Sequence, residues 1–243
     1  MVHRVRCAGS AIFATLALMG HLDLARAAEE RFEISSIKAI RPSLVDTITA
    51  LQQRDVARAK AAFETYDSGW NGIEVYVNTR SKDVYRLLEL EFQPRITKAL
   101  DKPNPDISEV LSDAQAMLVK FDEAVSMFAS AAPLSPLYDD VARLRIVRAH
   151  LREVTPALKA GNLARAQKSF EAFEDGWFNI EDFVRAQSLD AYVAIEGGMV
   201  QIEQALLMSG QPDVAAVTGL VAGVMDQYNG VVTEVQKQAR SAQ

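Results

Sequence analysis

The stretch Phe63–Val77, FETYDSGWNGIEVYV, recurs later in the chain as Phe170–Val184, FEAFEDGWFNIEDFV. Both stretches keep the aromatic residue at the start, the Gly-Trp pair and the Ile-Glu pair. The same constant offset relates further identical clusters: Ala57-Arg58-Ala59 with Ala164-Arg165-Ala166, and Pro105-Asp106 with Pro212-Asp213. This self-similarity predicts an internal duplication, because two copies are too few for a solenoid array.

Apolar residues in the repeated stretch follow a helical period. They recur every three or four residues in both copies: Phe63, Tyr66, Trp70, Ile73, Val77, and Phe170, Phe173, Trp177, Ile180, Val184. This spacing predicts an amphipathic helix whose apolar stripe packs in a core. Gly69 and Gly176 fall inside these helices, where glycine is unfavourable. We expect a close helix crossing at both glycines.

The whole chain outside its N-terminus is organised as helices separated by short turns. The expected helices are approximately 34–52, 56–78, 83–99 and 107–129, then 138–159, 163–186, 189–208 and 212–237. Asp55 and Asn162, and likewise Asp83 and Asp190, are expected to cap the helices that follow them. Short connections favour antiparallel neighbours. The predicted fold is therefore all-α, with two tandem homologous up-down four-helix units at 28–130 and 138–243, joined by a linker at 131–137.

The segment 1–27 has the pattern of a secretory signal peptide. Arg4 and Arg6 precede an apolar stretch at 11–19, and Ala25-Arg26-Ala27 provides a small-x-small cleavage site. The alternative is an uncleaved anchor, but the apolar stretch is short for a membrane span. The pattern predicts export to the periplasm.

Composition excludes several functional classes. The 243-residue chain has a formal net charge of −6, which disfavours nucleic acid as a partner. Cys7 and two of the three histidines lie in the predicted signal peptide, which leaves His150 alone in the mature chain. Thiolate zinc sites, haem attachment, catalytic triads and HExxH motifs are therefore absent, and we expect no enzyme, no zinc and no haem. No second apolar run is long enough for a transmembrane helix.

Acidic residues form a second stripe beside the apolar one. The next helix of each unit adds one more glutamate, one helical turn after a tyrosine. The candidate metal ligands are Glu64, Asp67, Glu74 and Glu89 in the first unit, and Glu171, Glu174, Glu181 and Glu196 in the second. Helical bundles build carboxylate metal sites from inward glutamates on facing helices. Oxygen ligands alone suit a hard cation such as Fe(III), Ca, Mg or Mn.

The same carboxylates also have an ordinary structural interpretation. Glutamate is a good helix former, and a carboxylate at the border of a core is satisfied equally well by an ion pair. The nearby cations that could supply such pairs are Arg58, Arg80 and Lys82 in the first unit, and Arg165 and Arg185 in the second.

The pattern of aromatic, glycine, tryptophan and glutamate resembles a known domain family. It is similar to the extracytoplasmic helical domain fused to bacterial high-affinity iron permeases of the iron/lead-transporter type. The matching positions are Phe173, Gly176, Trp177, Glu181, Arg185, Asp190, Tyr192 and Glu196, and in the first copy Tyr66, Gly69, Trp70, Glu74, Asp83, Tyr85 and Glu89. The resemblance covers less than half of each copy, and the membrane domain of the permeases is missing.

The resemblance implies a periplasmic accessory protein of iron uptake. Such a protein would bind Fe(III) or another oxygen-ligated cation through its helix-borne carboxylates, dock on a membrane iron permease, or do both. The alternative is a helical protein-interaction scaffold in the cell envelope that binds no metal. A scaffold predicts a sizeable exposed apolar surface.

Overall fold

The computed structural model describes residues 30–243, which form helices and turns and contain no strand. The predicted signal peptide therefore lies outside the described residues. Among the described residues, no helix is both long and apolar enough to cross a membrane. The all-helical prediction is confirmed for this part of the chain.

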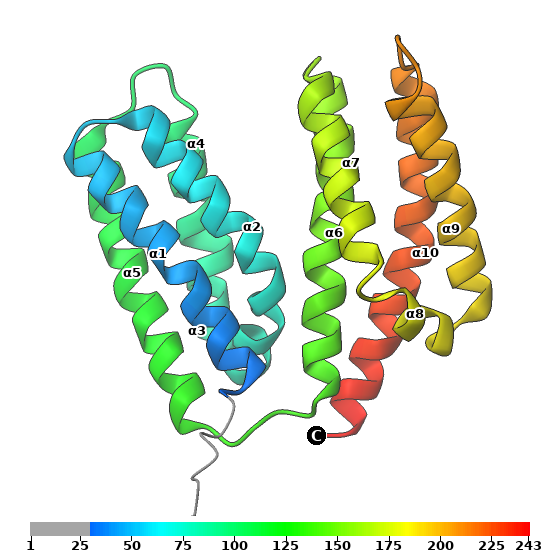
Figure 1. Cartoon of the computed structure of the whole chain (residues 1–243). Helices are drawn as coiled ribbons and strands as arrows, with labels where there is room; N and C mark the ends of the chain where they lie inside the picture. The colour runs from blue at the N-terminus through cyan, green and yellow to red at the C-terminus, as the bar shows by residue number, and fades with distance from the viewer. Residues whose placement is uncertain (1–29) are drawn as a thin grey trace, which may run out of the picture. The chain divides into compact units, whose positions relative to one another are not determined.

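The first half of the described chain follows the expected helix order. Its elements are α1 (Phe32–Gln52), α2 (Val56–Arg80), α3 (Lys82–Tyr85), the π-helical segment η1 (Arg86–Phe92), α4 (Gln93–Leu100) and α5 (Ile107–Ser130). Helix α1 lies beside α2 and α5 (Figure 1). The segments α3, η1 and α4 follow one another without a break, so they occupy the place of the single helix expected at 83–99.

The second half has the same order with one interruption. Its elements are α6 (Leu137–Lys159), α7 (Leu163–Trp177), α8 (Glu181–Gln187), α9 (Leu189–Ile202), the π-helical segment η2 (Glu203–Leu207) and α10 (Val214–Ser241). Helix α6 packs on α7 and α10, and α9 packs on α10 (Figure 1).

The single helix expected at 163–186 is wrong, because residues 178–180 form a turn between α7 and α8. There Asn179 N bonds to Gly176 O and Ile180 N to Trp177 O, so the turn tightens to 3₁₀-type bonding. The first half keeps α2 continuous, with Gly72 packed against Ile146 at the position of the exposed Asn179. Packing against α6 therefore keeps α2 helical at Gly72, whereas the equivalent Asn179 after α7 is exposed and lies in the turn.

Two of the four predicted helix caps are confirmed. Asp55 and Asn162 accept hydrogen bonds from the backbone N–H groups of Arg58 and Arg165, both at 3.0 Å. The predicted caps Asp83 and Asp190 are wrong. Ser81 and Ser188 act instead, because each stands in extended backbone immediately before the first helical residue.

The expected close crossings at Gly69 and Gly176 are confirmed. A methyl group added to Gly69 would lie 2.3 Å from the side chain of Ile40 on α1. One added to Gly176 would lie 2.9 Å from Val147 on α6. These contacts hold α2 and α7 close to the preceding helix and bring the buried rings of Trp70 and Trp177 into the core.

Side-chain contacts recur at equivalent positions of the two halves. Arg58 pairs with Asp46, and Arg165 pairs with Glu153. Similarly, Arg41 binds Asp122 across α1 and α5, while Arg148 binds the neutral Asn229 across α6 and α10. The two halves thus share a framework of contacts and differ in charge at particular positions.

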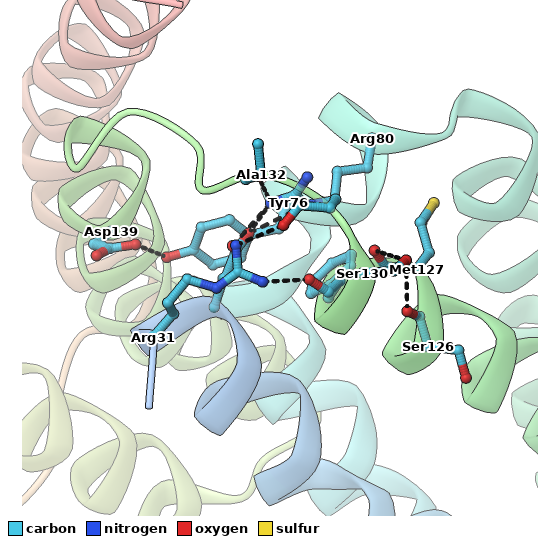
Figure 2. A network of polar contacts seen from close by, with 11 residues as sticks. Arg31, Tyr76, Arg80, Ser126, Met127, Ser130, Ala132 and Asp139 are labelled. Atoms are coloured by element: carbon cyan, nitrogen blue, oxygen red, sulfur yellow. Dashed lines mark hydrogen bonds and ion pairs between the residues drawn. The ribbon is translucent and has the colours of Figure 1, made fainter. Parts of the chain in front are cut away.

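The halves meet along α2 and α6. The Tyr76 hydroxyl of α2 donates to Asp139 of α6 at 2.7 Å, a contact visible in Figure 2. Beside it, Arg80 binds Glu33 at 2.7 Å and also donates to the Ala132 carbonyl of the connecting segment. The connecting segment is therefore anchored to the first half by a charged side chain.

Candidate functional site

A buried tryptophan holds a glutamate at the edge of each half. The Trp70 indole N–H on α2 donates to the Glu89 carboxylate on η1. In the second half, Trp177 on α7 donates to Glu196 on α9. Both tryptophans are buried, so each glutamate lies where the core meets solvent. Both glutamates were expected to be metal ligands, and each is bound to its tryptophan instead of standing free.

The first half extends this pair into a longer polar network. The Gln93 amide, in the orientation that matches donors with acceptors, donates to Asp67 Oδ1 at 3.1 Å and accepts from Trp70 Nε1 at 3.2 Å. Asp67, Gln93, Trp70 and Glu89 therefore form a connected chain. In the second half, the position of Gln93 is occupied by the buried Met199, because Ile202 to Leu206 align with Ile96 to Leu100, so the chain is reduced to the Trp–Glu pair.

The carboxylates of this network crowd one another. Burial raises the pKa of Glu89, and the charges of Glu74 and Asp67 raise it further, against the Trp70 hydrogen bond. Burial also raises the pKa of Asp67, with Glu153 and Glu64 adding to the effect against Arg152. Like charges held in a partly buried site favour a proton or a cation beside them. The network is thus electrostatically suited to a positive ligand.

Asp67 lines two neighbouring grooves. One, of about 310 Å³, lies between α2, α4, α6 and α7, and the other, of about 550 Å³, also exposes Glu89 and Gln93. The first groove contains two ion pairs, Lys60–Asp101 at 2.5 Å and Arg165–Glu153 at 3.2 Å. Its other two carboxylates, Glu64 and Asp67, have no ion-pair partner among the described residues.

Glu74, unlike the other predicted ligands, forms an ion pair with an arginine on a distant helix. Its Oε1 lies 2.6 Å from Arg145 Nη1 on α6, and both side chains are largely buried. Arg145 also donates to Gln236 on α10. Glu74 therefore joins the two halves. The arginines expected as partners pair elsewhere: Arg58 with Asp46, Arg80 with Glu33, Arg165 with Glu153 and Arg185 with Asp182.

The predicted ligands of the second half are spread more widely. Burial raises the pKa of Glu174 to about 7, helped by Glu203, Asp175 and Glu171. Glu181 begins α8 and is separated from α7 by the turn. The structure brings Glu171 and Glu174 together with Glu203, a residue that the sequence did not single out, while Glu181 and Glu196 lie on other elements.

Within residues 30–243, no three His, Cys, Asp or Glu side chains are grouped so that they could hold a metal ion together. A cation in the first-half grooves would therefore combine two carboxylates with other oxygen donors. Comparisons with protein-family models, curated proteins and solved structures find no match for this chain.

Proposed function

We propose that this protein is an exported accessory protein of iron uptake that binds a hard cation in the first-half grooves. The observation that carries the proposal is the proximity of Asp67 and Glu89. Both carboxylates line one groove, the charge of Asp67 raises the pKa of Glu89, and no ion pair neutralises either of them among the described residues. A cation between them relieves this repulsion. The role is one of binding, without a catalytic step.

A tandem duplication is part of the proposal. Matching contacts at equivalent positions support a common origin of the two halves, including Trp70–Glu89 with Trp177–Glu196 and the caps Asp55 and Asn162. In this account the second half retains the framework, while the first half retains the cation site. Glu74 and its pair with Arg145 hold the halves together beside the site.

Equilibrium dialysis of the purified protein against Fe(III)-citrate, Mn²⁺ and Ca²⁺ tests the proposal, with citrate alone as the blank. The variants Asp67→Asn and Glu89→Gln should each lower the affinity for the bound cation at least tenfold. The matched second-half variants Glu174→Gln and Glu196→Gln should leave it unchanged. Equal losses in both halves, or no binding by the native protein, would overturn the proposal.

A second candidate role, docking on a membrane iron permease, is favoured by one surface. Leu189, Val193 and Val200 share a face of α9 and are 61%, 59% and 49% exposed. Exposed apolar faces of this kind are typical of interaction sites. Co-flotation with vesicles carrying a purified iron permease, compared with protein-free vesicles, tests this role. Val193→Asp should abolish co-flotation; equal recovery with both kinds of vesicle contradicts docking on the permease.

A further inference from the structure

Tyr66 has a feature that its place in the apolar stripe does not explain. Its ring stacks on Phe63 and Trp70 and meets Phe121 edge-on. Its hydroxyl is fully buried next to Gln93 and has no hydrogen-bond partner of good geometry. Buried hydroxyl groups in proteins are nearly always hydrogen-bonded, so an orphan of this kind calls for an explanation.

The second half shows that the fold does not need this hydroxyl. The equivalent residue is Phe173, which packs against Trp177 and Tyr228 in the same way. Replacing a buried, unpaired hydroxyl by hydrogen would ordinarily favour the folded state. The first half nevertheless keeps the oxygen, close to the charges of Glu89 and Asp67.

The oxygen atoms around this position complement one another. Asp67 and Glu89 supply two carboxylates, and Gln93, which lines the same groove, supplies an amide oxygen that faces Trp70 Nε1. Two carboxylates alone are too few ligands for a hard cation, which takes about six oxygen donors. Tyr66 Oη and Gln93 Oε1 are the neighbouring oxygens that the second half lacks, where Phe173 and Met199 stand.

We propose that Tyr66 Oη and Gln93 Oε1 join Asp67 and Glu89 in an all-oxygen site for Fe(III), present in the first half alone. This inference rests on the proposed function and adds the ligand set and the oxidation state of the cargo. Binding breaks the phenol O–H bond, forms an Fe–O bond and releases one proton to solvent water, with no change in the oxidation state of iron. Displacing that proton requires a strongly polarising cation, which favours Fe(III) over Ca²⁺ or Mg²⁺.

Access to Tyr66 depends on Gln93. The Gln93 side chain is 5% exposed and lines the groove, while the hydroxyl behind it is fully buried. The cation therefore reaches Tyr66 after the Gln93 side chain rotates away from Trp70 Nε1.

Visible absorption during titration with Fe(III)-citrate tests the inference, because a phenolate bound to ferric iron gives a charge-transfer band. The native protein should develop this band. Tyr66→Phe, which installs the residue found in the second half, should abolish it and weaken binding at least tenfold. Two control variants should keep the band: Tyr76→Phe, which removes another buried tyrosine, and Tyr85→Phe, which removes the tyrosine one helical turn before Glu89.

The outcomes separate this inference from the proposed function. Iron binding that depends on Asp67 but gives no band overturns the tyrosine ligand and leaves the carboxylate site. A band that survives in Tyr66→Phe and disappears in Tyr85→Phe also overturns it. The absence of any iron binding overturns both proposals.

Discussion

The indole nitrogen of Trp70 donates a hydrogen bond to the carboxylate of Glu89, joining α2 to η1 across Ser81 and α3, which lie between them in the chain. The bond lowers the pKa of Glu89, against the larger opposite effect of burial. A single N–H group thus favours the charged form of a half-buried carboxylate at the edge of the core, beside the groove that Asp67 also lines.

Replacing Trp70 by phenylalanine should leave Glu89 without its donor. An unsatisfied charged group at a partly buried site costs about 1–3 kcal/mol, and the smaller ring adds a packing loss. We expect the free energy of unfolding, measured by urea denaturation at pH 7, to fall by at least this amount. In the Trp70→Phe background, Glu89→Gln should recover part of the loss. Native stability in the single variant would show that the bond contributes little.

Glu74 and Arg145 should be energetically coupled. Their side chains are 14% and 16% exposed, and removal of either partner leaves the other charge partly buried. Each of Glu74→Gln and Arg145→Met should lower the free energy of unfolding by about 1.5–3 kcal/mol. The double variant should lose less than the sum of the two single losses. Additive losses in this double-mutant cycle would mean that the pair does not hold the halves together.

Glu174 should make the protein less stable as pH rises. Its pKa is about 7 in the folded state against an ordinary value of 4.5, so the native state binds more protons between these two values. Stability from this group is therefore greatest in acid and is lost progressively between about pH 4.5 and pH 7. Melting temperatures measured across this range should fall less steeply for Glu174→Gln than for the native protein. The exposed Glu234→Gln serves as the control, and an unaltered slope in Glu174→Gln would refute the assignment.

Replacing Gly69 and Gly223 by alanine should change the free energy of unfolding in opposite directions. At Gly69 the added methyl would collide with Ile40, and overpacking of this kind costs about 1–3 kcal/mol. At Gly223, on the open face of α10, nothing lies within 4 Å, and alanine should stabilise the helix by about 0.5–1 kcal/mol. Urea denaturation of Gly69→Ala and Gly223→Ala measures both effects. Equal responses would contradict the close crossing of α1 and α2.

Local pattern was sufficient to predict much of the fold. The apolar stripe from Phe63 to Val77 places a helix and its buried face, because that period follows from helix geometry alone. The glycine at position 69 likewise indicates a crossing. The turn at 178–180 was not predictable in the same way, because it depends on whether another helix supports the segment, as Ile146 supports Gly72.

The candidate site was harder to predict for the same reason. The acidic stripe located Asp67, and the spacing after Tyr85 located Glu89. The partner of Glu74 is Arg145 on a distant helix, and sequence spacing carries no information about it. Gln93 was not singled out, since a lone glutamine in a helix has no distinctive pattern. The helical period of the apolar stripe predicted that Tyr66 lies in the core, and its ring is buried there. That period gives no information about the surroundings of its hydroxyl group.

The most direct measurement is the thermal unfolding of the purified protein with and without Fe(III)-citrate, Ca²⁺, Mn²⁺ and Cu²⁺, alongside the double variant Asp67→Asn, Glu89→Gln. A ligand at a hundredfold excess over its dissociation constant stabilises the folded state by about 2.7 kcal/mol. Fe(III) should selectively raise the melting temperature of the native protein and leave that of the double variant unchanged. A melting temperature unaffected by all four metals would contradict this expectation.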